Sequence, residues 1–322
     1  MSYTIKTDSL SKRFGDIQSV DNITIDVEQS EVYGFLGSNG AGKSTTMKML
    51  TTLLRPTSGS ARVAGYDIAT QQSSVREHIG FVQQESAIDE YLTGRENLIL
   101  QARLSRLEPA VAERRIDELM ETTGLADRQH DATVTYSGGM KKRLDIASGL
   151  LHRPTILFLD EPTVGLDIQT RHRIWEHIHT MHKEYDMTVF ISTHYMEEAD
   201  MLCDRICIID QGKVKAVGRP SQMKENLEQE VINMRSDNAV LLSDNISSID
   251  GVQDIRRTND TLQIHVSDGP QTIPIIFQKA QSLNIQIQSV SMTGPTLDDV
   301  YISYTGHQIR EQGPEPRRKR RW

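Results

Sequence analysis

The sequence is poor in the features that mark secreted and membrane-spanning proteins. It has only two cysteines, Cys203 and Cys207, which excludes a disulfide framework and suits a reducing compartment. No apolar run approaches the roughly 18–20 residues needed to cross a bilayer. The polar N-terminus, MSYTIKTDSLSK, lacks the apolar core of a signal peptide. We therefore expect a soluble, cytoplasmic protein. If it serves a membrane process, another chain must supply the membrane path.

An excess of basic residues is also absent. The 322 residues include 36 Lys and Arg against 44 Asp and Glu, so the net charge is −8. This charge argues against a generally basic surface that binds nucleic acid, although it allows a local basic patch, and we expect no nucleic-acid partner. Aromatic residues are few, at 5%, but 37% hydrophobic and 25% charged residues fit ordinary globular cores. At roughly 150 residues per domain, the length suggests about two domains.

Four short apolar or nearly apolar runs predict strands buried on both faces, as in a parallel sheet covered by helices. They are Val32–Leu36, Ile156–Leu159, Val189–Ile191 and Ile206–Ile209. Between about residues 94 and 153, apolar residues recur at helical spacing instead: Leu98, Ala102, Ile116, Leu119 and Met120. This predicts an α/β domain over residues 1–220, with a mixed sheet core and an inserted helical subdomain at about 85–153.

The pattern restarts after an expected linker at residues 221–228. Residues 229–306 then predict strands and helices in the order β-α-β-β-α-β, a small α+β, ferredoxin-like domain. Its hairpin would turn at Asn259–Asp260, and a last helix would run from Leu297 to Tyr304. Thr296 and Asp299 resemble a capping box for that helix. Residues 307–322 are polar and end in a basic run, which predicts a disordered tail that is solvated or contacts an anionic membrane face.

The segment Gly37–Ser44 reads G-S-N-G-A-G-K-S and fits the phosphate-loop pattern G-x-x-x-x-G-K-[ST]. Glycines let backbone N–H groups curl around phosphate oxygens, and the following helix points its positive end at them. Lys43 would reach the β- and γ-phosphates, and the Ser44 hydroxyl would bind Mg²⁺. The alternative is an ordinary glycine turn. The candidate ATP-binding residues are Gly37, Ser38, Asn39, Gly40, Ala41, Gly42, Lys43, Ser44 and Thr45.

A pair of acids ends the predicted strand at Ile156–Leu159. Asp160 would lie at its carboxyl end, the edge that faces the ligand crevice in open α/β sheets. That position suits a carboxylate that holds Mg²⁺ through water, as in other phosphate-loop ATPases. Glu161 would polarise the attacking water as a general base. The alternative is that both acids cap the next turn, which Pro162 favours.

A third segment, Y-S-G-G-M at Tyr136–Met140, precedes the acidic strand. With the two motifs above, it makes residues 4–220 resemble the ATP-binding subunits of ABC transporters, whose signature is usually L-S-G-G-Q. Tyr136 and Met140 depart from that signature, and Met140 is left out of the site because it cannot make the hydrogen bonds of a glutamine. Alone, the S-G-G segment favours a flexible loop.

The resemblance implies further site residues. Phe14 would stack on adenine, although it could be a core aromatic. Gln84 would act at the metal and the reacting phosphate, although Gln83 beside it leaves the register open and an exposed loop amide is the alternative. His194 would contact the γ-phosphate and orient the water, although it could be a polar residue at a strand end. Asp167 would belong to the D-loop.

The resemblance also implies a head-to-tail homodimer with two ATP molecules at its interface. Each ATP would be held by the phosphate loop of one subunit and by Ser137, Gly138 and Gly139 of the other. A helix that begins near Met140 would aim its dipole at the γ-phosphate.

The segment G-P-T-L-D-D-V-Y at Gly294–Tyr301 narrows the family. It resembles the C-terminal extension of daunorubicin-resistance-type exporter ATPases. The resemblance implies an ATPase at the inner face of the cell membrane that powers export of a drug, lipid or other amphiphile through a separate permease. The alternative is a soluble ABC ATPase that regulates a non-transport partner. Such proteins usually have tandem ATPase domains or long coiled coils, and neither pattern occurs here.

Overall fold

The computed structural model describes residues 3–227 and 230–308, which divide into two compact units. One unit ends at Arg219 and the other spans Pro220–Gln308. The basic end of the chain lies outside the described residues, and so does most of the expected tail. Among the residues described, no helix combines the length and apolar character of a membrane span.

The first unit is built on a six-stranded sheet in the order β11-β10-β4-β9-β8-β7. All neighbours are parallel except β10 and β11. The strands are β4 (Val32–Leu36), β7 (Ile79–Val82), β8 (Ile156–Asp160), β9 (Thr188–Thr193), β10 (Arg205–Asp210) and β11 (Lys213–Gly218). The sheet contains all four predicted strands, and every residue of β4, β8 and β9 is buried, as continuous apolar runs require.

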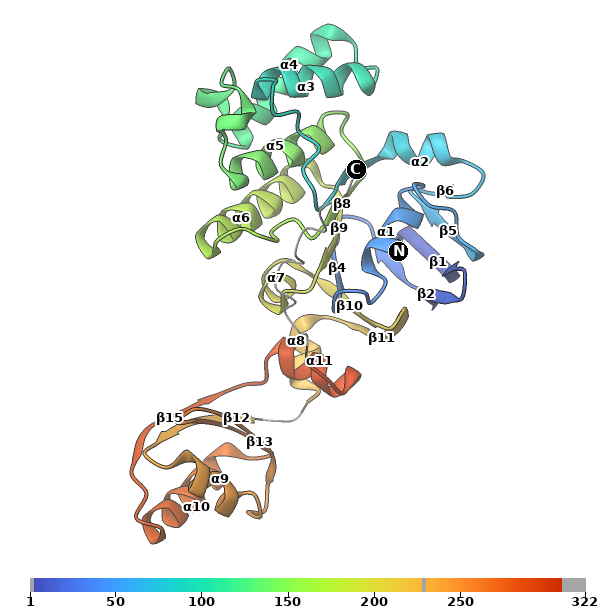
Figure 1. Cartoon of the computed structure of the whole chain (residues 1–322). Coiled ribbons are helices and arrows are strands. Elements are labelled where there is room, and N and C mark those ends of the chain that lie inside the picture. The colour runs from blue at the N-terminus through green and yellow to red at the C-terminus, as the bar shows by residue number, and fades with distance from the viewer. Residues whose placement is uncertain (1–2, 228–229, 309–322) are drawn as a thin grey trace, which may run out of the picture. The chain divides into compact units, whose positions relative to one another are not determined.

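The same unit has a five-stranded antiparallel sheet that was not predicted from the sequence. Its order is β2-β1-β5-β6, and β3 pairs with β1. The strands are β1 (Tyr3–Phe14), β2 (Ile17–Ile23), β3 (Asp26–Glu28), β5 (Ser58–Val63) and β6 (Tyr66–Asp67). Helix α1 (Lys43–Leu50) lies between the two sheets (Figure 1) and buries Met47, Met49 and Leu50 in the core they share.

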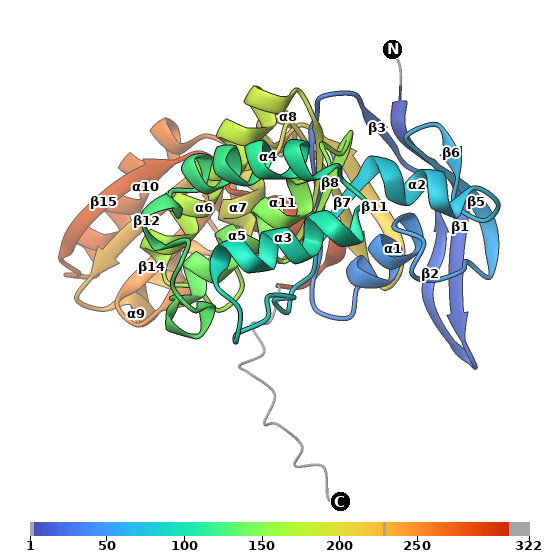
Figure 2. The same cartoon turned by 90° about the horizontal axis from the view of Figure 1, so that it is seen from above.

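Helices complete the first unit. The helical subdomain consists of α3 (Gly94–Leu104), α4 (Pro109–Thr122) and α5 (Gly138–Leu150), which pack on one another (Figure 2). Short 3-10 helices at Ala126–Arg128 and Thr133–Thr135 connect α4 to α5. The five apolar residues that recur at helical spacing are all buried, two on α3 and three on α4, which confirms the predicted helices. The other helices are α2 (Gln72–His78), α6 (Ile168–Tyr185) and α7 (Met196–Leu202).

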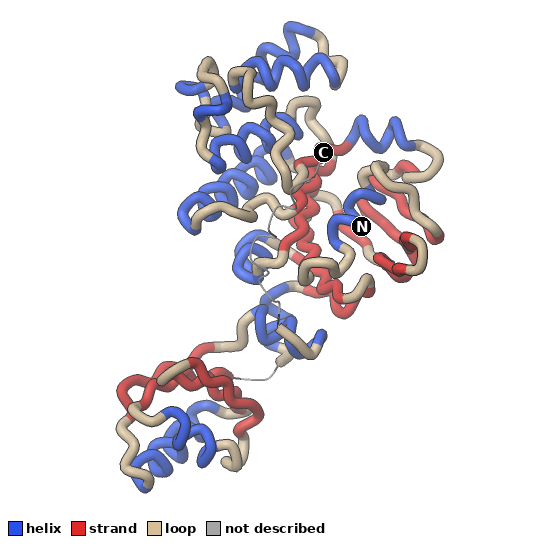
Figure 3. The backbone as a smooth tube through the Cα atoms, viewed as in Figure 1, coloured by secondary structure: helices blue, strands red, loops and turns tan. Residues whose placement is uncertain are grey.

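The second unit has the predicted ferredoxin-like topology. Its strands are β12 (Glu230–Ser236), β13 (Val252–Thr258), β14 (Thr261–Val266) and β15 (Ile287–Thr293). They form an antiparallel sheet in the order β13-β14-β12-β15. Helices α9 (Ala239–Ile246) and α10 (Gly269–Ser282) cover one face of it (Figure 3), and Ile232, Ile264 and Ile276 lie in the core between them.

Two short helices border this domain. Helix α11 (Leu297–Thr305) begins with the predicted capping box of Thr296 and Asp299. The expectation of a linker over residues 221–228 differs from the structure, because Pro220–Glu225 form helix α8. Pro220 and Met223 are buried and α8 packs against α11, so apolar burial orders a segment whose composition suggested a connector.

Candidate active site

The loop between β4 and α1 requires glycine at two of its positions. Gly42 has φ 106°, and a Cβ there would lie 2.7 Å from the Ser19 carbonyl oxygen. A Cβ at Gly37 would lie 2.4 Å from the Ile209 carbonyl oxygen. Side chains at either position would push the loop out of shape, so the glycine spacing fixes a tight turn that ends at Lys43, the first residue of α1.

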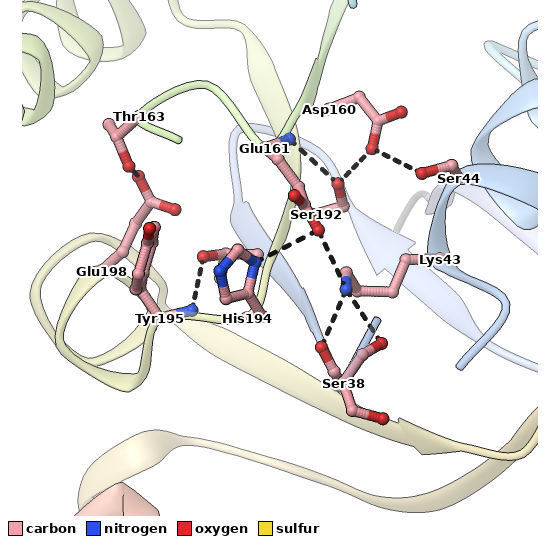
Figure 4. Close-up of polar contacts among 12 residues, drawn as sticks. Ser38, Lys43, Ser44, Asp160, Glu161, Thr163, Ser192, His194, Tyr195 and Glu198 are labelled. Carbon is pink, nitrogen blue, oxygen red and sulfur yellow. Dashed lines mark hydrogen bonds and ion pairs between the residues drawn. The ribbon is translucent and has the colours of Figure 1, made fainter. Parts of the chain in front are cut away.

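The Lys43 ammonium lies at the centre of the site (Figure 4). Its Nζ donates to the carbonyl oxygens of Gly37, at 2.8 Å, and Ser38, at 3.1 Å. It also lies 3.0 Å from Glu161 Oε1, and both side chains are buried. Burial lowers the pKa of the Lys43 ammonium, and the Glu161 carboxylate opposes that shift. A cation is therefore held inside the loop with its charge directed at the space that the loop encloses.

Glu161 follows the last residue of β8. Its backbone adopts φ 47°, which is unusual for a residue with a side chain, and its amide donates to Ser192 O and Oγ, both at 3.1 Å. Glu161 Oε1 also lies 3.3 Å from His194 Nδ1. Burial alone would raise the pKa of Glu161, but the hydrogen bond from His194 and the charge of Lys43 hold it below its ordinary value. Glu161 is thus a carboxylate at neutral pH, the form that a general base needs.

Asp160 is the last residue of β8 and is equally buried. Its Oδ1 accepts from Ser192 Oγ at 2.6 Å and from Ser44 Oγ at 3.2 Å. A carboxylate and a hydroxyl are therefore adjacent at the start of α1, and these are oxygen donors that Mg²⁺ prefers. The alternative that Asp160 and Glu161 cap the next turn is not what the structure shows, because their carboxylates contact Ser44, Ser192, Lys43 and His194 instead of the amides of that turn.

These residues surround a cavity of about 740 Å³. It is lined by Ser19, Asn39, Gly40, Gly42, Lys43, Ser44, Thr45, Gln84, Glu161, Val164, Gly165, His194 and Tyr195. Gln84 lines the cavity and Gln83 does not, so Gln84 is the glutamine of the loop after β7 that faces the candidate site. Segments far apart in the sequence thus meet at the carboxyl ends of the parallel strands, where ligands bind in open α/β sheets.

Other candidate residues lie elsewhere on the described surface. Phe14 ends β1 and is 48% exposed, and it does not line the cavity. Ser137 caps α5 by accepting from the Met140 amide, so that helix begins at Gly138 rather than near Met140. Asp167 accepts from the Thr170 amide and hydroxyl, and these bonds lower its pKa.

Gly138 and Gly139 open helix α5, outside the cavity. A Cβ at Gly139 would lie 2.4 Å from Thr170 Cγ2, so this glycine permits close packing of α5 on α6. Three loop residues also do not line the cavity. Gly37 and Ser38 turn their carbonyl oxygens toward Lys43, and Ala41 is buried in the core between the sheets.

Several residues of the site belong to none of the predicted motifs. Ser192 is fully buried and contacts both Asp160 and Glu161. Ser19 lines the cavity and donates from Oγ to Thr45 Oγ1 at 3.0 Å. Tyr195 lines it as well, with its ring 4.2 Å from that of His194. A serine in a strand or turn is common, so only its three-dimensional neighbours reveal the role of Ser192. Tyr195 directly follows the candidate His194, and that adjacency was the available signal.

Comparison with known proteins agrees with this geometry. The chain matches the family described as ABC transporter over residues 20–164. It matches the family described as ATP-binding protein DrrA1-3-like, C-terminal domain, over residues 218–305. A solved structure of cbiO1 from Clostridium perfringens, part of the ABC transporter complex cbiONQ, superposes with a TM-score of 0.66 at 27% identity, over 70% of this chain and 92% of that one.

Relatives of known name align along nearly the whole chain. The daunorubicin/doxorubicin resistance ATP-binding protein DrrA of Streptomyces peucetius is 38% identical, over 97% of this chain and 95% of the relative. The linearmycin resistance ATP-binding protein LnrL of Bacillus subtilis is 34% identical, over 95% of this chain and all of the relative.

The chain therefore belongs to the ABC transporter ATP-binding family. Within it, the chain is an ATPase subunit of an exporter and has the DrrA-like C-terminal domain. An ATP-binding subunit of a transporter implies a membrane permease as its partner.

Proposed function

We propose that the chain works as a homodimer that hydrolyses ATP with Mg²⁺ at the inner face of the membrane. The cycle would power export of a drug, lipid or other amphiphile through a separate permease. The observation that carries the proposal is the buried contact of Lys43 and Glu161 at a cavity that the phosphate loop encloses. The names of the relatives, which concern resistance to daunorubicin, doxorubicin and linearmycin and export of Nod factor, support export of such compounds.

The loop residues would hold the phosphates, and Phe14 would stack on the base. Ser44, Gln84 and Asp160, the last through water, would hold Mg²⁺, which neutralises phosphate charge when bound. Phosphate oxygens that reach Lys43 compete with Glu161 for its ammonium, which now lies 3.0 Å from the carboxylate. The freed carboxylate accepts a proton from the attacking water, and His194 orients that water from its place 3.3 Å from Glu161.

The proposed homodimer would use residues that do not line the ATP cavity of their own chain. Ser137, Gly138 and Gly139 start α5, and the amides of that turn present a positive helix end. We propose that this end contacts the γ-phosphate held by a second copy, and that Asp167 lies at the same interface. ATP would then close the dimer, and hydrolysis would reopen it.

The permease would dock on a groove of about 860 Å³ in the first unit. Its lining includes Leu53 and Leu104, which are 58% and 69% exposed, and Gln83 from the loop that carries Gln84. Exposed apolar residues beside this loop suit a contact that links the ATP cavity to a membrane subunit. Residues up to Arg219 would carry out the chemistry, and Pro220–Gln308 would have an accessory role in assembly.

The test of the proposed reaction is Glu161→Gln. The amide keeps the size of the side chain but cannot take the proton, so we expect turnover to fall about 10²–10⁴-fold while ATP still binds. An ATP-dependent dimer should accumulate on size-exclusion chromatography with Mg²⁺. Turnover close to that of the unchanged chain would refute Glu161 as the base.

The partner is tested by purifying the chain from its native cells. A co-purifying membrane protein, lost with Leu53→Asp or Leu104→Asp at unchanged ATP affinity, supports the permease and its docking groove. A ribosome or DNA in its place would support the alternative, a soluble ABC ATPase that regulates a non-transport partner.

A further inference from the structure

Two buried charges on the second and third turns of α5 hold the loop that carries Gln84. Lys142 is 7% exposed, and its Nζ donates to the carbonyl oxygens of Gln83, at 2.9 Å, and Gln84, at 3.2 Å. Asp145 is 6% exposed, and its Oδ1 accepts from the Ala87 amide at 3.2 Å. Residues 83–89 form neither helix nor strand, so side chains of a neighbouring helix supply bonds that regular structure would otherwise provide.

Packing alone does not explain these two residues. Burial lowers the pKa of the Lys142 ammonium, and the carboxylates of Asp145 and Asp160 oppose that shift. Burial also raises the pKa of Asp145, against the hydrogen bonds and the Lys142 charge that lower it. Burying charge carries a desolvation penalty that an apolar residue of similar size would avoid. The hydrogen bonds offset that penalty only while the loop stays in place against α5.

The helix and the loop connect three parts of the proposed machinery. Gln84 lines the ATP cavity. Gln83, Ala87 and Asp145 line the groove proposed for the permease. Helix α5 itself begins at Gly138, one turn before Lys142, with the residues proposed to meet the ATP of the second copy.

We propose that Lys142 and Asp145 are positioning residues that make α5 and the Gln84 loop move as one body. This inference rests on the proposed function, because it deepens how that site would be regulated. A change at Gln84 on nucleotide binding would thereby shift the start of α5, and with it the surface offered to the second copy. We call Lys142 and Asp145 together the clamp. Without the clamp, the loop responds to nucleotide while α5 stays where it is.

The clamp is tested with Lys142→Met, which keeps an unbranched side chain only one atom shorter and removes its donors. In full-length protein carrying Glu161→Gln, we expect ATP affinity by calorimetry to change by less than about twofold. The ATP-dependent dimerisation constant, measured by sedimentation, should weaken at least tenfold. Lys142→Gln, whose amide can still donate to the carbonyl oxygens, should recover much of the loss. Lys183→Met, at an exposed lysine on α6, is the control for the substitution type.

A second readout does not require a dimer. In dilute single chains, ATP should slow amide hydrogen exchange both in residues 83–89 and at the start of α5. Lys142→Met should confine that slowing to the loop. Coupled protection that survives the substitution overturns the clamp, as does unchanged dimerisation. If Glu161→Gln alone never dimerises with ATP, the proposed homodimer fails, and the exchange experiment still decides the clamp.

If Lys142→Met does not fold, two variants of Asp145 still test the clamp. Asp145→Asn keeps an oxygen that can accept from the Ala87 amide, whereas Asp145→Leu has none. The clamp requires Asp145→Asn to resemble the unchanged chain and Asp145→Leu to uncouple the loop from α5. Identical exchange patterns in these two variants would overturn it.

Discussion

Lys43 Nζ lies 3.0 Å from Glu161 Oε1, with 4% and 6% of the two side chains exposed. The contact joins the phosphate loop to the end of β8, and the same carboxylate oxygen faces His194. Each charge therefore holds the other in a place where neither could remain alone without a large penalty. ATP phosphates offer Lys43 a different anion, so a nucleotide that binds Lys43 replaces Glu161 in this contact and releases its carboxylate.

The first prediction concerns Lys43→Ala. Removal of the ammonium leaves the phosphates without their buried cation and leaves Glu161 as a buried carboxylate that has lost its lysine partner and keeps the contact with His194. We expect ATP affinity to fall at least tenfold in calorimetry with Mg²⁺, and the free energy of unfolding to fall by about 3–5 kcal/mol. Lys48→Ala, an exposed lysine on the same helix, is the matched control. Equal ATP affinity in the two variants would contradict the phosphate-loop assignment.

The second prediction concerns Ser192, whose hydroxyl donates to Asp160 Oδ1 at 2.6 Å and accepts from the Glu161 amide at 3.1 Å. Ser192→Ala removes the group that aligns the proposed Mg²⁺ residue with the proposed base. We expect the Mg²⁺ concentration for half-maximal turnover to rise several-fold, and the free energy of unfolding to fall by about 1–3 kcal/mol.

Mg²⁺ titrations of the Ser192 variants separate alignment from general damage. Ser192→Thr keeps the hydroxyl and should keep the Mg²⁺ requirement, even if its extra methyl group costs stability. An unchanged Mg²⁺ requirement in Ser192→Ala would mean that the serine only supports the strand.

The third prediction is a pH dependence at Glu198, which is fully buried on α7. Its Oε1 accepts from Thr163 Oγ1 at 2.8 Å and from Trp175 Nε1 at 2.9 Å. Burial raises the pKa of this carboxyl in spite of the hydrogen bonds that lower it. The folded chain then holds a proton that the unfolded chain releases. The free energy of unfolding therefore falls as pH rises above about 4.5, the ordinary pKa of Glu.

Glu198→Gln imitates the protonated acid and should therefore remove this loss. We expect its melting temperature to exceed that of the unchanged chain by a margin that is smallest near pH 5 and grows toward pH 8. Glu197→Gln, at the exposed neighbouring position, should show no such growth. A margin for Glu198→Gln that stays constant with pH would rule out the raised pKa.

Much of the fold could be predicted because burial leaves a direct trace in the sequence. Strand β4 is a continuous apolar run that is buried on both faces, and the hairpin turn at Asn259 has φ 53°, a backbone that Asn tolerates well. The antiparallel sheet gave no comparable trace, because β1 mixes Lys, Thr, Asp and Ser with few apolar residues. Helix α8 was missed because its order depends on contact with α11, far along the chain.

The candidate site could be predicted as motifs but not as a network. Spacing identified Lys43, Asp160 and Glu161, yet no pattern shows that Ser192 bridges two of them. Lys142 is a still harder case. A lysine between Lys141 and Arg143 predicts a solvated side chain, and only the three-dimensional position of the Gln84 loop explains its burial.

The last prediction separates chemistry from assembly by ending the chain at Arg219. Every residue that lines the ATP cavity precedes that point, and Pro220–Gln308 has its own core with Ile232, Leu242 and Ile276. We therefore expect the shortened chain to melt cooperatively and to bind ATP within about twofold of the full-length affinity. If the second unit serves assembly, permease recovery in a pull-down or ATP-dependent dimerisation should fall sharply. Loss of ATP binding in a chain that still folds would mean that both units are needed for one functional core. Unchanged assembly and transport would make the second unit dispensable, and its role would then have to be sought outside the transport cycle.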